Sequence, residues 1–187
     1  VHTDTYYMKL EGGNSQIVKV DYGDGEVEEV DYFRGNRKYY APGDYDVTIY
    51  YKGNPTGFER NGRSVFGCNH MSGYPYEWYD CVPIVKIEIP ETFEDTGMGF
   101  YHLEEITFIG DCAMLKKDVS PLVNGRNLAK INSIYASEDG RFLIRDGVLL
   151  ACARAGAPMS EYVVPEGVHT IAKNAFNSVE DITKIVL

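Results

Sequence analysis

The second half of the chain repeats itself, and this restricts the fold more than any other feature of the sequence. Three short units carry apolar residues at their first and fourth positions: 103–108, 128–133 and 182–187. The spacing from Leu103 to Leu128 is close to the spacing from Val164 to Leu187. Repeats of about 20–29 residues with this pattern are typical of a leucine-rich solenoid, which has one short strand per turn. We therefore expect stacked turns over 84–187.

The residues between the apolar positions of these turns are expected to point outward. They form either a solvated sheet face or a binding surface. The expected outward residues are Lys86, Glu88, Glu104, Glu105, Thr107, Lys130, Asn132, Thr183 and Lys184.

A second pattern, at 139–150, predicts a β-hairpin that turns at Asp146-Gly147, because Gly supplies the positive φ that a tight turn needs.

The segment 164–176 points to a known family. It reads Val-Pro-Glu-Gly-Val-His-Thr-Ile-Ala-Lys-Asn-Ala-Phe, and it resembles the BspA-like leucine-rich repeat of bacterial surface proteins, whose pattern is Ile-Pro-x-x-Val-x-x-Ile-x-x-x-Ala-Phe. The earlier repeats depart from this pattern. The segment from Pro90 to Leu103 is shorter than the corresponding segment from Pro165 to Ile182, and it lacks the Ala-Phe pair. The resemblance implies a role in adhesion at the cell surface or in a secreted protein.

The first 53 residues indicate a different β-structure. Strand-like runs at 16–22 and 26–30 flank the turn Gly23-Asp24-Gly25, and the run 45–50 alternates, with Tyr45, Val47 and Ile49 on one face. The motifs Val-Asp-Tyr-Gly-Asp-Gly at 20–25 and Tyr-Ala-Pro-Gly-Asp-Tyr-Asp-Val-Thr-Ile at 40–49 resemble the PKD-type immunoglobulin-like domain, with Tyr22 where Trp is usual. That family implies an extracellular spacer or adhesion module.

The sequence thus predicts a mainly β chain in three parts. These are a small PKD/Ig-like β-sandwich at 1–53, a Gly/Tyr-rich connector at 54–83, and an irregular leucine-rich-repeat solenoid at 84–187. The content of 15 Tyr and 19 Gly favours strands and turns over helices. The sequence ends in a strand-like run at 185–187, so we expect further repeats, a cap, or self-association through the C-terminal repeat end.

The connector contains the candidate site residues. Its aromatic side chains either form an exposed platform for a ligand or pack the junction between the two domains. Cys68 and Cys81 flank this loop and either form a disulfide or stay reduced. Cys112 and Cys152 are expected to be small buried hydrophobic residues. The aromatic residues of the candidate platform are Tyr74, Tyr76, Trp78 and Tyr79.

The charge of the chain restricts its partners. The formal net charge of −10 repels phosphate backbones and anionic lipid headgroups, so we expect neither nucleic-acid nor membrane-surface binding. No apolar stretch approaches the roughly 20 residues that cross a bilayer. We expect an extracellular or cell-surface location, with any secretion signal or lipid anchor upstream of Val1. The expected partner is a protein or a glycan.

No motif in the chain predicts catalysis or a cofactor. The acids Asp21, Asp24, Glu26 and Glu28 depart from EF-hand spacing and are explained as turn-forming and solvated residues. Zinc binding or a Cys/His nucleophile at Cys68, His70, Cys81 and His102 lacks a supporting acid at a recognisable spacing. The leading hypothesis is therefore a non-catalytic binding or adhesion module. The alternatives are a purely structural envelope protein and a glycan-active enzyme with paired carboxylates.

Overall fold

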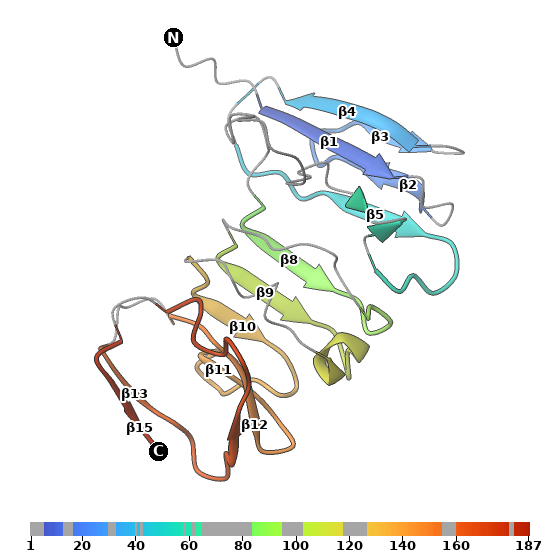
Figure 1. The fold of residues 1–187 in the computed structure, drawn as a ribbon. Coiled ribbons are helices and arrows are strands. Elements are labelled where there is room, and N and C mark those ends of the chain that lie inside the picture. The colour runs from blue at the N-terminus through green and yellow to red at the C-terminus, as the bar shows by residue number, and fades with distance from the viewer. Residues whose placement is uncertain are drawn as a thin grey trace. The chain divides into compact units, whose positions relative to one another are not determined.

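The structure is a computed structural model that describes residues 6–12, 17–29, 33–39, 41, 43–57, 59–60, 63–64, 84–94, 103–117, 127–154, 160–179 and 182–187 (Figure 1). The described residues are mainly β with one short 3-10 helix, which confirms the predicted class. None of their helices is long and apolar enough to cross a membrane. The elements are β1 (Tyr6–Gly12), β2 (Ile17–Asp21), β3 (Val27–Glu29), β4 (Phe33–Tyr39), β5 (Thr48–Tyr51), β6 (Glu59–Arg60), β7 (Arg63–Ser64), β8 (Lys86–Ile89), β9 (Glu105–Phe108), η2 (Ala113–Lys116), β10 (Lys130–Asn132), β11 (Phe142–Arg145), β12 (Val148–Cys152), β13 (Glu161–Val163), β14 (Thr170–Ile171) and β15 (Lys184–Val186).

The chain divides into two compact units. Unit 1 comprises Val1–Val82 and Asp95–Gly97, and unit 2 comprises Pro83–Glu94 and Met98–Leu187. Unit 1 thus includes most of the range 54–83 that the sequence predicts as a connector. In that range the structure describes Asn54–Gly57 and the short antiparallel pair of β6 and β7.

Unit 1 is built from antiparallel strands. Strand β2 lies between β3 and β5, and β1 pairs with β4 over their whole length. The burial of 45–50 alternates as predicted, with Tyr45, Val47 and Ile49 half-buried and the residues between them exposed. Ile17, Val20 and Tyr22 are at most 4% exposed and form the described part of this unit's core.

The predicted turn at 23–25 joins β2 to β3. The backbone N–H of Tyr22 donates to the carbonyl oxygen of Glu26 at 3.1 Å and closes the hairpin loop. Gly23 has φ +72°, and a Cβ atom placed on it would lie 2.6 Å from the carbonyl oxygen of Asp46. Glycine is required here for two reasons, the left-handed backbone and the close approach of the chain that leads into β5.

Three consecutive turns of unit 2 form one parallel sheet in the order β10-β9-β8. Glu105 is opposite both Lys86 and Lys130, so the offset from β9 to β10 equals the sequence spacing of Leu103 and Leu128. Both leucines are fully buried, as are Ile106 and Ile131. Stacking therefore buries the recurring apolar positions, and the unit has a solenoid-like stack of about three turns. These turns pair regularly although they lack the Ala-Phe pair.

A hydrogen-bond pattern recurs where the stacked strands begin. The carbonyl oxygen of Val85 accepts from two successive amides, those of Glu104 and Glu105, at 2.8 and 3.0 Å. The carbonyl oxygen of Glu104 accepts in the same way from Ala129 and Lys130. The oxygen of Ser160 accepts from Thr183 and Lys184, at 2.8 and 3.0 Å. The strands β9, β10 and β15 are thus anchored to their parallel partners β8, β9 and β13 by shared acceptors.

The later part of unit 2 combines antiparallel and parallel pairing. Strands β11 and β12 form the predicted hairpin, in which Asp146 and Gly147 have φ of +50° and +72°. Strand β14 adds to β12 in parallel, and β13 pairs with β15 in parallel. Glu161 is opposite Lys184, and their sequence spacing equals that of Val164 and Leu187, in agreement with the predicted repeat.

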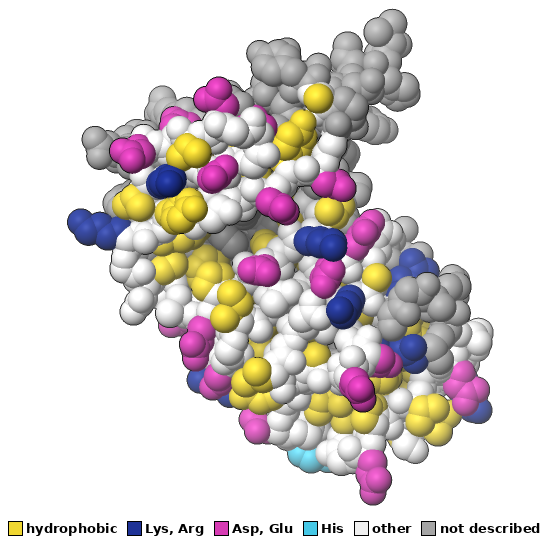
Figure 2. All heavy atoms as spheres, turned by 180° about the vertical axis from the view of Figure 1, so that it is seen from behind, with side chains coloured by type: hydrophobic (Ala, Val, Ile, Leu, Met, Phe, Trp, Pro, Cys, Tyr) yellow, Lys and Arg dark blue, Asp and Glu magenta, His cyan; other side chains and the backbone are white. Residues whose placement is uncertain are grey.

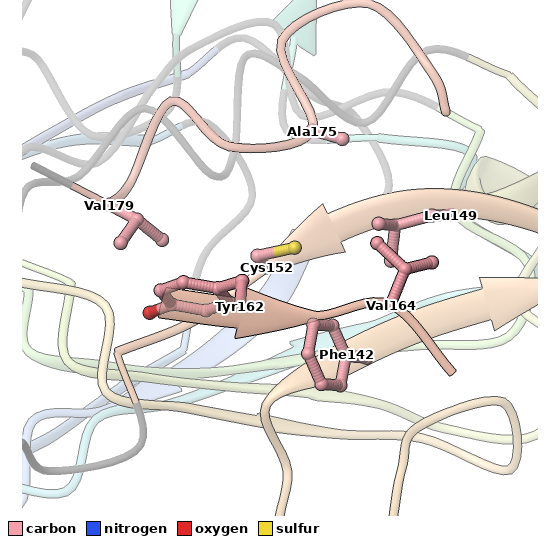
Figure 3. Packing of buried hydrophobic residues seen from close by; sticks show 7 residues of the cluster. All are labelled: Phe142, Leu149, Cys152, Tyr162, Val164, Ala175 and Val179. Carbon is pink, nitrogen blue, oxygen red and sulfur yellow. The ribbon is translucent and has the colours of Figure 1, made fainter. Parts of the chain in front are cut away.

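The core of this region surrounds Tyr162 (Figure 3). Its ring meets the rings of Phe142 and Phe176 edge to face, with centroids 6.1 and 5.9 Å apart. Ala175 is 2% exposed, and its carbonyl oxygen accepts from the amide of Cys152 at 2.7 Å. The Ala-Phe pair at 175–176 therefore has a packing role: the small residue permits close backbone approach, and the aromatic residue covers Tyr162.

The last repeat unit, 182–187, is less buried than the others. Ile185 is opposite the fully buried Tyr162, yet it is 42% exposed, and Leu187 is 90% exposed. The equivalent residues of β9 and β10, Ile106 and Ile131, are fully buried. Self-association through this end of the repeats stays a prediction.

Candidate functional site

The best-defined surface in the described part is the outward face of the sheet β8–β9–β10. Alternate residues of a strand point to the same side, and the three strands are in register, so their outward residues form rows across the sheet. Pro90, Ile109 and Ile134 follow the second row by two residues, just past the strand ends, and we count them as a third row by sequence position; Ile134 lies in the turn 133–136. We call these nine residues the outward face; its rows are Lys86–Glu105–Lys130, Glu88–Thr107–Asn132 and Pro90–Ile109–Ile134.

Glu105 is the centre of the polar part of this face. Its Oε1 accepts from Asn132 Nδ2 at 2.7 Å, and its Oε2 lies 3.2 Å from Lys86 Nζ. Asn132 Nδ2 also donates to Thr107 Oγ1 at 3.1 Å. The hydrogen bond from Asn132 and the contact with Lys86 lower the pKa of Glu105, and the charge of Lys130 lowers it further. Neighbouring turns are thus joined by side chains as well as by their backbones.

The nine positions that the sequence predicts as outward are all exposed or half-buried, and six of them belong to the outward face: Lys86, Glu88, Glu105, Thr107, Lys130 and Asn132. Three apolar members of the outward face were missed: Pro90, which is half-buried, and Ile109 and Ile134, which are 48% and 66% exposed. Extending the pattern by two residues beyond Glu88, Thr107 and Asn132 would have found them. Figure 2 shows basic and acidic side chains intermixed, with apolar side chains among them, on the side turned away in Figure 1.

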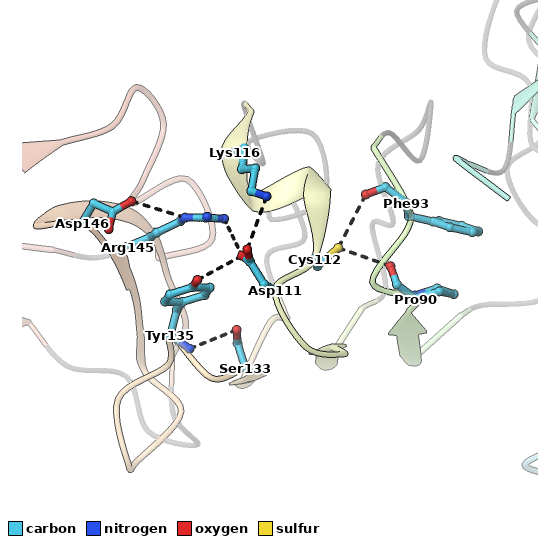
Figure 4. A network of polar contacts seen from close by, with 9 residues as sticks. All are labelled: Pro90, Phe93, Asp111, Cys112, Lys116, Ser133, Tyr135, Arg145 and Asp146. Carbon is cyan, nitrogen blue, oxygen red and sulfur yellow. Dashed lines mark hydrogen bonds and ion pairs between the residues drawn. The ribbon is translucent and has the colours of Figure 1, made fainter. Parts of the chain in front are cut away.

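A second polar cluster surrounds Asp111 (Figure 4). Tyr135 donates from its hydroxyl to Asp111 Oδ1 at 3.0 Å, and Arg145 Nη1 lies 2.9 Å from the same oxygen. Lys116 Nζ lies 3.3 Å from Asp111 Oδ2, and the Arg145 guanidinium lies 4.9 Å from the centre of the Tyr135 ring. These contacts, led by the bond from Tyr135, lower the pKa of Asp111. The Asp111 cluster joins η2, the loop after β10 and the end of β11.

The two described cysteines are structural, as predicted. Cys112 and Cys152 are free thiols with no solvent exposure. Cys112 Sγ donates to the carbonyl oxygens of Pro90 and Phe93, at 3.4 and 3.6 Å. Burial raises the pKa of both thiols. A buried thiol with a raised pKa is a poor nucleophile and a poor metal ligand.

Two of the four acids considered in the sequence, Asp21 and Asp24, accept hydrogen bonds within a turn, as expected. Asp21 Oδ1 accepts from the amide of Gly23 at 3.0 Å, and Asp24 Oδ1 accepts from the amide of Glu26 at 3.1 Å. Glu28 accepts from the Tyr22 hydroxyl at 2.9 Å. Over the described residues, no three His, Cys, Asp or Glu side chains lie together in an arrangement that could hold a metal ion.

The candidate platform and the candidate disulfide lie outside the described residues. This applies to Tyr74, Tyr76, Trp78 and Tyr79, and also to Cys68 and Cys81. Both interpretations of each set stay predictions. The outward face of unit 2 is therefore the surface on which a functional argument can rest.

Comparison with known proteins gives no match: no family model, no curated protein and no solved structure is similar to this chain. The class that the described residues define is a mainly β protein with a solenoid-like stack of turns.

Proposed function

We propose that this protein is a non-catalytic binding module that recognises a protein or a glycan at a cell surface or as a secreted protein. The observation that supports it is the outward face of β8–β9–β10. Stacked turns hold its polar and apolar side chains in fixed rows, so a partner would meet a preorganised surface.

We also propose the finer family assignments. The antiparallel β2–β3 hairpin and the alternating burial before β5 support a PKD-like unit 1. Parallel stacking at the spacings of the sequence repeats, with the buried Ala175, supports BspA-like leucine-rich repeats in unit 2. These families also motivate the extracellular location, with a lipid anchor upstream of Val1 as one form of it.

Two other functions are alternatives to a binding module. A purely structural envelope protein would use the same stacked turns without a soluble ligand. A glycan-active enzyme needs a carboxylic acid whose pKa is raised, so that it can donate a proton near neutral pH. The described carboxyl groups whose pKa is shifted all have it lowered: Glu94, Glu105, Asp111 and Asp139.

The test is to probe the purified chain on arrays of extracellular proteins and of glycans. We expect a discrete set of ligands whose signal falls when Thr107→Lys places a charge in the middle of the outward face. Lys173→Glu, in an exposed turn outside that face, is the matched control and should leave the signal unchanged. Blank arrays of both kinds would contradict the proposal and favour the structural alternative, and release of sugars from the glycans would favour the enzyme.

A further inference from the structure

The outward face has a graded composition. The first row, at the strand starts, has two lysines around Glu105, and the second row is polar. The third row, at the strand ends, consists of Pro90, Ile109 and Ile134. Isolated exposed apolar residues are ordinary on a protein surface. Here, however, Ile109 and Ile134 hold the same position in consecutive turns, so they are expected to form one apolar strip rather than two separate exposures.

Acids that form no ion pair with another described residue border this strip. Among the described residues, the cations Lys86, Lys116 and Arg145 all have a carboxylate partner. Lys130 is in no ion pair with a described residue, but it belongs to the first row, at the opposite end of the strands from the apolar strip. The carboxylates of Glu88 and Glu91 belong to none of the ion pairs formed there, and both residues are exposed. The Glu91 carboxyl group packs over Gly110, next to Ile109, within 3.1–3.4 Å of where a Cβ atom would stand. The uncompensated charge beside the apolar strip is therefore negative.

From this arrangement we infer that the strand-end side of the outward face binds a partner-protein segment that carries aliphatic side chains alternating with lysine or arginine. Its aliphatic side chains would cover Ile109 and Ile134, and its cations would meet Glu88 and Glu91. Apolar burial would provide affinity, and the opposite charges would orient the segment. The inference rests on the proposed binding function and narrows it to one surface and one class of ligand.

The chemistry of the face favours a polypeptide over a glycan. Protein modules commonly hold sugar rings against aromatic side chains, and none of the nine residues of the outward face is aromatic. Aliphatic side chains beside the carboxylates of Glu88 and Glu91 match the composition of a basic, apolar protein segment instead.

Peptides with controlled charge and apolar content provide the test. Fluorescence anisotropy at physiological ionic strength would compare three short labelled peptides: alternating Lys and Val, alternating Lys and Ser, and alternating Glu and Val. We expect the Lys/Val peptide to bind most tightly. The double variant Ile109→Ser with Ile134→Ser should weaken it by about tenfold or more, because apolar burial is lost. Ile171→Ser, an exposed residue of β14, is the matched control and should not change the affinity.

A charge reversal separates the electrostatic part of the inference. Glu88→Lys with Glu91→Lys should abolish preference for the Lys/Val peptide and create preference for the Glu/Val peptide, whereas Glu166→Lys should not. All the substituted residues are exposed, so thermal unfolding should show that these variants fold. The inference is overturned if the Lys/Ser peptide binds as tightly as the Lys/Val peptide, if the face variants bind like the natural chain, or if no peptide binds. If the ligands found on the arrays bind both double variants as tightly as the natural chain, the proposed binding function stands and only its assignment to this surface is overturned.

Discussion

Asn132 donates a hydrogen bond of 2.7 Å to Glu105, which lies on the neighbouring turn of the same sheet. This bond is the largest cause of the lowered pKa of Glu105, and the contact with Lys86 comes second. Asn132→Ala should therefore raise the pKa of Glu105 toward its ordinary value. Lys86→Met should raise it as well, because the lysine contributes both a hydrogen bond and a positive charge. NMR titration of the Glu105 side chain in each variant measures both changes, and an unchanged pKa in Asn132→Ala would contradict the geometry.

The stability of the protein should fall in acid. The pKa values of Glu105, Asp111 and Asp139 are lowered in the folded chain, so the unfolded chain binds more protons as the pH falls below about 5. The stabilisation by these groups is present above their unfolded pKa values and is lost as the pH falls through the folded ones. Thermal unfolding between about pH 2 and pH 7 should show this fall.

Asp111→Asn should flatten that pH profile and lower the melting temperature at pH 7. The substitution removes the charge that Arg145 and Lys116 contact. Lys116 then loses its carboxylate partner in the cluster, and Arg145 keeps only Asp146, at 3.5 Å. Glu166→Gln removes a carboxylate from an exposed turn and serves as the matched control. A profile for Asp111→Asn that parallels the natural one would show that the Asp111 cluster does not contribute to stability.

The repeat signal predicts the stacking of unit 2 well, for a physical reason. Regular spacing of apolar residues defines both the strands and the residues that oppose each other, as the pairs Glu105–Lys130 and Glu161–Lys184 demonstrate. The Asp146-Gly147 turn was predictable because few other dipeptides adopt positive φ at both positions.

The Asp111 cluster was not predictable from the sequence. Tyr135 and Arg145 reach Asp111 from later turns, and no periodicity marks polar side chains that meet only after stacking. The pairing of β1 with β4 gave no signal either, because β2 and β3 lie between them in the sequence and no repeated pattern links the two. Local patterns thus predict elements and repeats, whereas polar contacts between turns depend on the assembled fold.

Neighbouring isoleucines of β10 and its turn should differ sharply in their effect on stability. Ile131 is fully buried between stacked turns, and Ile134 is 66% exposed. Ile131→Ala should lower the free energy of unfolding by about 2–5 kcal/mol, because it leaves a cavity and removes apolar burial. Ile134→Ala should change it by less than about 0.5 kcal/mol. Urea unfolding of the two variants measures the difference. Similar losses in the free energy of unfolding would contradict the assignment of Ile131 as buried and Ile134 as exposed.

Two glycines of the β2–β3 turn offer a second matched pair. Both have positive φ, but the space around Gly25 is open, whereas a Cβ on Gly23 would meet backbone atoms of Asp46. Gly25→Ala should cost about 1 kcal/mol from backbone strain alone. Gly23→Ala should cost more, because the chain before β5 must also move. Equal losses in thermal or urea unfolding would contradict this close approach.

The shared carbonyl acceptors at the strand starts have a consequence for how such a chain can vary. Glu105 pairs with Lys86 and with Lys130, although it lies nearer in the sequence to the first than to the second. The carbonyl oxygens of Val85 and Glu104 thus align each strand with the strand before it in the sheet, although the segments that connect the strands differ in length. Insertions and deletions between strands should therefore be tolerated without disturbing the rows of the outward face, so the chain can change its loops while it preserves its surface.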